Sequence, residues 1–390
     1  MDLDLSRLDE ALASRDLDGH LIDADAETPD QRYLSGFDAP DPFVTLYTPE
    51  GIALLVSTME YGRAKSQSRA DAVRQYADYD GRALVDEYGS DEGRNRAIAR
   101  FLEEFDVEAV STDRRFPLVT ADGLRDQGIE VQPDRSDAVE RTRAVKTETE
   151  IAYVREAQRA NEAAMDEAQR LLAEAAVEDG VLTLDGEPLT SERVRHAIEA
   201  TLLEEGCALD ETIVASGPES AVPHEQGSGP IEANEPVIVD IFPRDKATHY
   251  HADMTRTFVR GEPSDRIEAF YDLTAEAKRA ALDAVEPGVT GETVHDAACE
   301  VYEEAGYPTL RTDESTDTGF THSTGHGVGL AVHERPRIGR HGEELEPGNV
   351  ITVEPGLYDP DVGGVRIEDL IVVTEDGYEN LTDYPESLRL

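Results

Sequence analysis

The sequence predicts a two-domain α/β protein whose second domain contains an internal duplication. Its 390 residues exceed one ordinary hydrophobic core and fit two domains. Residues 1–145 show short apolar strands alternating with helical patterns, which is typical of a small α/β domain. Residues 146–390 run twice through the order helix, helix, strand pair. This repetition predicts two related halves that face each other across a pseudo-two-fold axis, with a site between them.

The first domain is defined by apolar runs that have the length of strands. The clearest are Gly19–Ile22, Phe43–Thr48 and Ile52–Ser57, and a helical pattern follows near Asp91–Phe105. This part of the sequence contains no recognisable chemical motif. We therefore expect the chemistry to lie in residues 146–390.

The two halves of the second domain have matching helix signals. In the first half, a helix follows Thr147 with an acidic first turn, and a second helix has Thr190 or Ser191 as its cap. In the second half, Ser264 caps a helix over 264–285, and a shorter helix covers 289–307. The strand pairs are expected at Glu235–Phe242 and Met254–Val259, and at Val350–Glu354 and Gly364–Thr374.

The charge of the chain is strongly negative. It carries 85 acidic and 36 basic residues, a net charge of -49, and its only lysines are Lys65, Lys146, Lys246 and Lys278. Such self-repulsion is tolerated where salt screens it, so we expect a protein from a halophile. The same charge argues against a nucleic-acid partner.

The remaining composition indicates a cytoplasmic protein. The N-terminus is acidic and lacks the apolar region of a secretory signal, and no apolar run is long enough to cross a bilayer. Two cysteines without a CxxC motif indicate a reducing compartment. We therefore expect neither a membrane anchor nor disulfides.

Four acids in strand settings point to a metal site. Asp240 lies inside the apolar run VIVDIF, Asp253 precedes MTRTFV, Glu354 ends NVITVEP, and Glu368 lies in GVRIEDLIVV. An acid in an apolar strand is costly to bury unless it is paired or binds a metal. The duplication would bring these acids together, where their mutual repulsion calls for cations.

Histidines accompany these acids in one glycine-rich stretch. His326 lies between two glycines in HSTGHGVGLAVHE, His333 follows seven residues later, and His224 occupies the matching loop of the first half. Carboxylates with one imidazole suit Mn²⁺, Co²⁺, Fe²⁺ or Zn²⁺. His333 could also be a core histidine on an apolar stretch, and His322 is expected to be structural or surface-exposed.

Together, VIVDIFPR, ADMTRTFV, GHGVGLAVHE, ITVEPGLY and GGVRIED closely resemble the pita-bread metallopeptidases, the group of prolidases, proline aminopeptidases and methionine aminopeptidases. The resemblance covers residues 147 to 390. Residues 1–145 look like the creatinase/prolidase-type N-terminal domain. The resemblance implies a domain boundary at 145/146, a pita-bread fold for 146–390 and a homodimer.

The resemblance also implies two divalent ions per chain, with Mn²⁺ or Co²⁺ favoured and Zn²⁺ or Fe²⁺ as alternatives. Asp253 and Glu368 would bridge the ions, and Glu354 would both bind metal and take a proton from the attacking water. His224 and His333 would bind the substrate carbonyl and stabilise its charge. The five implied metal ligands are Asp240, Asp253, His326, Glu354 and Glu368.

Arg337 and Arg366 have open roles at this stage. Arg337 could grip a substrate carboxylate, or it could pair with a local acid such as Glu334 or Glu343. Arg366 shares its strand face with Glu368, so we expect it to orient the acids.

The implied function is hydrolysis of Xaa-Pro peptide bonds by a prolidase-like dipeptidase. An Xaa-Pro aminopeptidase acting on longer peptides is the first alternative. A methionine aminopeptidase is disfavoured by the N-terminal domain, and a metal-free creatinase-like hydrolase by the intact ligands. A non-catalytic pita-bread scaffold that binds a protein partner is the alternative from another class.

Overall fold

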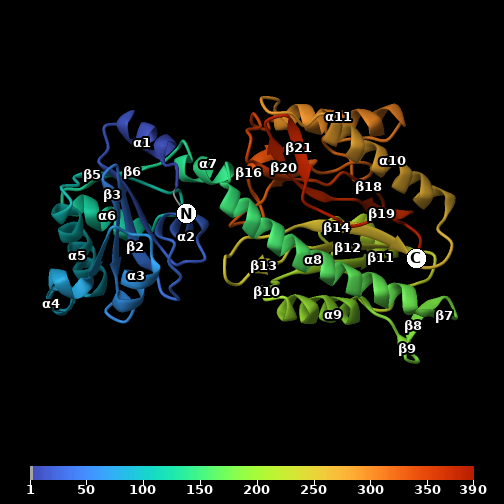
Figure 1. The fold of residues 1–390 in the computed structure, drawn as a ribbon, viewed down its shortest axis with the longest axis horizontal. Coiled ribbons are helices and arrows are strands. Elements are labelled where there is room, and N and C mark those ends of the chain that lie inside the picture. Colours follow the sequence, from blue (N-terminus) through green and yellow to red (C-terminus); the bar gives the residue numbers. More distant parts are fainter. Residues whose placement is uncertain (1–2) are drawn as a thin grey trace. The chain divides into compact units, whose positions relative to one another are not determined.

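The chain folds into two compact units, Met1–Arg143 and Ala144–Leu390, in a computed structural model that describes residues 3–390. Figure 1 shows the first unit in blue and the second in green to red. No helix within residues 3–390 has both the length and the apolar character that a membrane span needs.

The first unit is built on a six-stranded mixed sheet with helices packed around it (Figure 1). Its strand order is β4-β3-β2-β1-β5-β6, with β1, β2 and β3 antiparallel and the outer pairings parallel. The strands are β1 Gly19–Ala24, β2 Phe43–Thr48, β3 Gly51–Val56, β4 Ala72–Gln75, β5 Ala109–Thr112 and β6 Glu130–Pro133. The helices are α1 Ser6–Ala13, α2 Pro29–Ser35, α3 Tyr61–Gln67, α4 Gly81–Tyr88, α5 Ser90–Glu104, α6 Leu118–Asp126 and α7 Ala138–Ala144.

The first half of the second unit packs two helices on a three-stranded sheet of order β11-β12-β14. A small three-stranded sheet, β7-β8-β9, and a two-stranded pair, β10-β13, complete this half. The elements are α8 Glu148–Glu174, β7 Ala176–Glu178, β8 Val181–Leu184, β9 Glu187–Pro188, α9 Ser191–Glu204, β10 Cys207–Ala208, β11 Thr212–Ser216, β12 Pro236–Ile241, β13 Arg244–Asp245 and β14 Met254–Val259.

The second half repeats the order of two helices followed by strands. Its helices α10 and α11 pack on a five-stranded sheet, β16-β15-β17-β20-β21, and on the pair β18-β19. Figure 1 shows the strands of both halves between the helix pairs. The elements are α10 Asp265–Asp283, α11 Gly291–Glu304, β15 Gly325–Gly327, β16 Glu334–Ile338, β17 Val350–Val353, β18 Gly356–Asp359, β19 Gly363–Arg366, β20 Asp369–Thr374 and β21 Gly377–Asn380.

Hydroxyl side chains begin all four of these long helices. Thr147, Thr190, Ser264 and Thr290 each accept a hydrogen bond from a backbone N–H in the first turn, which satisfies a donor that the helix itself leaves open. Of the two caps considered for α9, the structure selects Thr190. The apolar faces of these helices cover the sheets, so the inner sheet faces are free to carry polar side chains.

Candidate metal centre

The hairpin of β12 and β14 presents two buried acids on one face. Asp240 lies in β12 opposite Thr255, and Asp253 lies immediately before β14. Because side chains two residues apart share a face of a strand, Asp253 and Thr255 point to the same side as Asp240. Asp240 and Asp253 are 9% and 4% exposed, so both carboxylates are removed from water.

His326 comes from β15, where two glycines allow neighbouring backbone to approach closely. A Cβ on Gly325 would lie 2.0 Å from the carbonyl oxygen of Thr352, and one on Gly327 would lie 2.1 Å from that of Arg335. Any larger residue would push the strand away. The ladder between β15 and β16 also shifts register between His326 and Gly327, which re-aims the side chain.

Glu354 and Glu368 lie at strand ends. Glu354 directly follows β17, and Glu368 lies in the gap between β19 and β20. The expectation of one continuous strand over Gly364–Thr374 is therefore wrong. The backbone N–H of Glu368 does not pair within the strands of its own half. It donates to the carbonyl of Thr255 at 3.1 Å, and this hydrogen bond joins the two halves.

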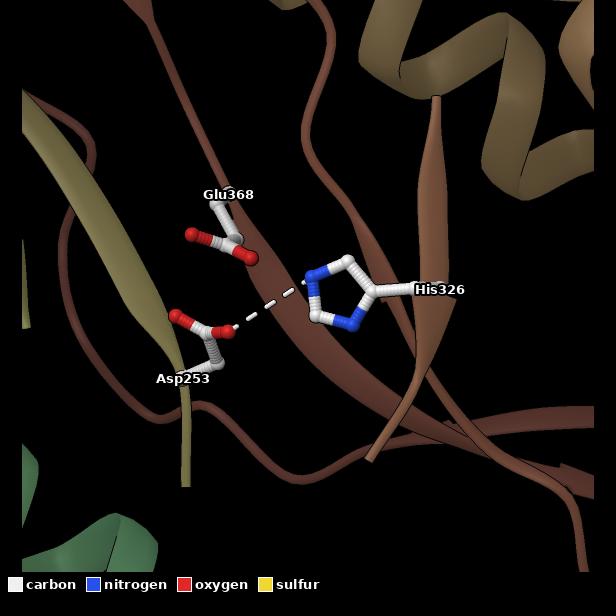
Figure 2. Close-up of side chains that lie close together, drawn as sticks. All are labelled: Asp253, His326 and Glu368. Carbon is white, nitrogen blue, oxygen red and sulfur yellow. Dashed lines mark ion pairs between the residues drawn. The ribbon is translucent and has the colours of Figure 1, made fainter. Parts of the chain in front are cut away.

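These side chains converge on one point, as Figure 2 shows for Asp253, His326 and Glu368. One ligand atom from each of these three lies within 4.8 Å of the others. His326 Nε2 is 3.7 Å from Asp253 Oδ2 and 3.2 Å from Glu354 Oε1. His326 Nδ1 lies 3.2 Å from the carbonyl oxygen of Gly327, which can only accept, so Nδ1 carries the proton. Nε2 is therefore the ring nitrogen that faces the carboxylates, and it is the one that would bind a metal.

Arg366 orients the acids from within the sheet. It is 3% exposed, and its Nη2 donates to Asp240 Oδ2 at 2.5 Å. Its Nε donates to Thr255 Oγ1 at 3.2 Å, and this hydroxyl donates to Glu368 Oε2 at 2.7 Å. One arginine thus fixes an acid from each half, in the orienting role expected for it.

Burial and mutual repulsion govern the electrostatics of the carboxylates. Burial raises the pKa of Asp253 and of Glu368 well above the ordinary range, and neighbouring acids raise it further. Burial raises the pKa of Asp240 as well, although Arg366 opposes it. Burial alone would raise the pKa of Glu354, but hydrogen bonding and charge from His326 lower it to about 2. Ionising all the carboxylates together therefore requires added positive charge.

The residues present fit divalent cations. Asp240 Oδ1 and Glu368 Oε1 are buried and have no hydrogen-bond partner within residues 3–390. Buried carboxylate oxygens in this state cost free energy unless a cation or water binds them. Four carboxylates and one imidazole are oxygen and nitrogen donors of the kind that Mn²⁺, Co²⁺, Fe²⁺ and Zn²⁺ accept.

The expected substrate residues lie at the edge of this group. The ring centroids of His333 and His326 are 4.2 Å apart, and burial lowers the pKa of His333 to about 4. His224 is exposed, and its charge contributes to lowering the pKa of His333. Arg337 of β16 is exposed and lies directly opposite His326 in the ladder.

His322 was missed as a site residue. Its Nδ1 donates to the carbonyl of Ser323 at 2.7 Å, and its Nε2 accepts from the hydroxyl of Tyr358 at 2.9 Å. Tyr358 in turn accepts from Arg366 at 3.0 Å. Burial lowers the pKa of His322 to about 4, so the ring is neutral. Its spacing of four residues from His326 was the available signal, but Tyr358 lies 36 residues further along the chain, and Arg366, which bonds Tyr358, lies 44 residues further.

A partly open cavity of about 250 Å³ is lined by residues close in sequence to the candidate ligands. Phe242 and His251 line it, and they lie two residues from Asp240 and Asp253 respectively. Val332, the neighbour of His333, lines it as well. The lining is both apolar and polar, and it does not include the candidate ligands themselves.

Two family models match the chain, one for each unit. The model for metallopeptidase family M24 matches residues 152–375, and that for the creatinase/prolidase N-terminal domain matches residues 5–155. An Xaa-Pro dipeptidase of Pyrococcus horikoshii is 30% identical over 382 residues, which is 97% of this chain and 96% of that protein.

Solved structures agree over the full length. The prolidase from Pyrococcus horikoshii OT3 superposes with a TM-score of 0.80 at 28% identity, covering 98% of this chain and 99% of the other. The X-Pro aminopeptidase from Thermotoga maritima gives 0.78 at 26% identity, covering 98% and 100%. The expected fold class, a creatinase-type N-terminal domain followed by a pita-bread catalytic domain, is confirmed.

Proposed function

We propose that this chain, which belongs to metallopeptidase family M24, is a metal-dependent, prolidase-like dipeptidase that hydrolyses Xaa-Pro bonds. The observation that carries the proposal is the buried group in which acids of both halves surround His326. The relative from Pyrococcus horikoshii, which spans nearly the whole chain, supports the substrate class.

In this proposal the two halves share the metal ligands. Asp253 and Glu368 would contribute to holding both ions, Asp240 would complete one, and His326 with Glu354 would complete the other. The unpartnered oxygens of Asp240 and Glu368 support this assignment. When bound, two such ions supply a water of lowered pKa and stabilise negative charge on a substrate oxygen. Mn²⁺ or Co²⁺ is our first assignment, with Zn²⁺ or Fe²⁺ as the alternatives.

The chain's own residues supply proton transfer and carbonyl binding. Glu354 stays ionised, because its pKa is about 2, and so it can accept the proton of the attacking water. His333 is neutral at pH 7, because its pKa is about 4, and it can donate a hydrogen bond to the substrate carbonyl. His224 is assigned the same carbonyl.

Metal removal tests this function. Chelator-treated protein should not cleave an Xaa-Pro dipeptide, and added Mn²⁺ or Co²⁺ should restore cleavage, measured as released proline. Undiminished activity after metal removal would exclude the metal-dependent reading. No cleavage of any Xaa-Pro peptide by the metal-loaded protein would favour the protein-binding scaffold.

The similarity to the X-Pro aminopeptidase from Thermotoga maritima supports a second candidate function, an Xaa-Pro aminopeptidase that acts on longer peptides. An aminopeptidase must let the peptide continue beyond proline, whereas a dipeptidase must recognise a free carboxylate there. We assign recognition of the free carboxylate to Arg337.

We also propose that the protein is a cytoplasmic homodimer from a halophile.

High salt is expected to stabilise the protein. The net charge of -49 is self-repelling, and molar KCl shortens the screening length to about 3 Å. We expect the melting temperature to rise by roughly 5 °C or more between 0.1 M and 2 M KCl. Differential scanning calorimetry measures this shift. A flat or falling melting temperature would contradict the halophilic assignment.

A further inference from the structure

A second cluster of charged side chains is buried behind the candidate metal centre. It consists of Arg256 of β14, Lys278 of α10 and Asp369 of β20, which are 1%, 2% and 4% exposed. Asp369 directly follows Glu368 in the chain. Buried charges persist only where partners satisfy them, so the contacts of this cluster indicate what it holds.

The charged side chains of Arg256 and Lys278 bind the carboxylate of Asp369. Its Oδ1 accepts from Arg256 Nη2 at 2.9 Å, and its Oδ2 accepts from Lys278 Nζ at 2.5 Å and from Asn380 Nδ2 at 2.9 Å. Both oxygens of the buried carboxylate are thus used, and Asp369 fixes the positions of Arg256 and Lys278.

Arg256 connects Asp369 to the backbone of Glu368. Its Nη1 donates to the carbonyl oxygens of Glu368 and Thr255. Thr255 accepts from the N–H of Glu368 through its carbonyl, and its hydroxyl donates to Glu368 Oε2. Both backbone groups of Glu368 and one of its carboxylate oxygens are thus held by two consecutive residues of the other half. Its remaining oxygen, Oε1, is the one without a partner within residues 3–390.

Arg256 and Lys278 also bind the C-terminal tail. Arg256 donates to the carbonyl oxygens of Tyr384 and Pro385 at 2.9 and 3.1 Å. Lys278 Nζ donates to Glu386 Oε1 at 2.6 Å. Residues 384–386 therefore pack directly on the cluster.

We propose that Arg256, Lys278 and Asp369 form a positioning cluster that fixes Glu368 for metal binding, and that the C-terminal tail is part of it. This inference rests on the proposed metal-dependent function. None of the three is assigned a contact with substrate. The cluster acts by holding the Glu368 backbone, so that its free oxygen keeps one direction. Loss of a group that holds a ligand in this way typically weakens metal affinity or activity.

Metal affinity distinguishes a cluster that positions Glu368 from a cluster that only stabilises the fold. Lys278→Met removes one buried cation and keeps a long unbranched stem. We expect Mn²⁺, titrated into metal-stripped full-length protein in a calorimeter, to bind this variant roughly 10–100-fold more weakly than the parent. We expect kcat at saturating Mn²⁺ to stay within about threefold of the parent, because no reacting group has changed.

Two further variants make the result decisive. Glu386→Gln leaves the buried trio intact and weakens only the tail contact, so it provides the test if Lys278→Met does not fold; we expect roughly threefold weaker Mn²⁺ binding. Arg389→Gln is the matched control. It removes tail ion pairs to Glu262 and Glu268 that do not reach Glu368, and it should bind Mn²⁺ like the parent.

The outcomes are distinguishable. Parent-like Mn²⁺ affinity in both Lys278→Met and Glu386→Gln, with a lowered melting temperature, would make the cluster merely structural and overturn the inference. Weaker binding in Arg389→Gln as well would overturn the specific role of the cluster. A parent protein that binds no Mn²⁺ at all would instead overturn the proposed function on which the inference rests.

Discussion

Replacing Glu368 by glutamine is expected to lower kcat/KM for an Xaa-Pro dipeptide by roughly four orders of magnitude, or about 5.4 kcal/mol. Glu368 is 1% exposed and is assigned to both metal ions. Glutamine keeps the volume and the acceptor that Thr255 Oγ1 uses, but it removes the charge that binds cations. Steady-state kinetics at saturating Mn²⁺ would measure the loss, and elemental analysis would measure the metal bound per chain.

Asp253→Asn should behave in the same way, because Asp253 is the other proposed bridging acid. Glu375→Gln is the matched control, since it makes the same chemical change at an exposed position just after β20. It should keep full activity. Both site variants should keep the parent's circular dichroism spectrum, because each replaces a buried acid with a neutral group of the same shape. Full activity in metal-stripped Glu368→Gln would refute the two-metal assignment.

The long helices and the strands with clear apolar runs were predictable because their signals are local. Periodic apolar residues and hydroxyl caps lie within one element, so Thr147 and Ser264 mark helix starts that the structure reproduces. The strand Met254–Val259 has the bounds expected from its apolar run. The candidate ligands could be singled out because acids inside apolar strands conflict with burial unless something compensates them.

Features set by contacts between distant residues were not predictable. The break in the strand at Glu368 depends on hydrogen bonds to Thr255 and Arg256, which lie more than a hundred residues earlier. The hydrogen bond between His322 and Tyr358 joins residues that are 36 positions apart, so the local sequence does not indicate it. The positioning cluster joins β14, α10, β20 and the C-terminal tail, and no local pattern connects these four segments.

Arg337 was expected either to bind a substrate carboxylate or to pair with a local acid. The structure argues against the local pairing. Glu334 accepts instead from Lys146 Nζ at 2.5 Å. Glu343 pairs with the side chain of Arg335 and accepts only the backbone N–H of Arg337, at 2.9 Å. In the part of the chain that the structure describes, no carboxylate lies within 4.0 Å of the Arg337 guanidinium. Its ladder position opposite His326 puts its side chain on the same sheet face as the candidate metal centre.

Arg337→Ala is therefore expected to raise KM for an Xaa-Pro dipeptide about 10–100-fold, the worth of one hydrogen-bonded charge pair at about 1.5–3 kcal/mol. The change in kcat should be small, because the carboxylate is bound equally in the ground state and the transition state. The parent should cleave the dipeptide with a higher kcat/KM than the matching Xaa-Pro-Yaa tripeptide, and the variant should lose that preference. Initial rates on both peptides at saturating Mn²⁺ provide the measurement.

Arg340→Ala serves as the control, because Arg340 is exposed nearby and pairs with Glu314. It should leave both KM values unchanged, which would separate a specific contact from a general loss of positive charge near the substrate. A carboxylate gripped by Arg337 blocks extension of the peptide, so the parent cannot favour the tripeptide if this assignment holds. If the parent does favour the tripeptide, Arg337 does not read a free carboxylate, and the enzyme is an Xaa-Pro aminopeptidase.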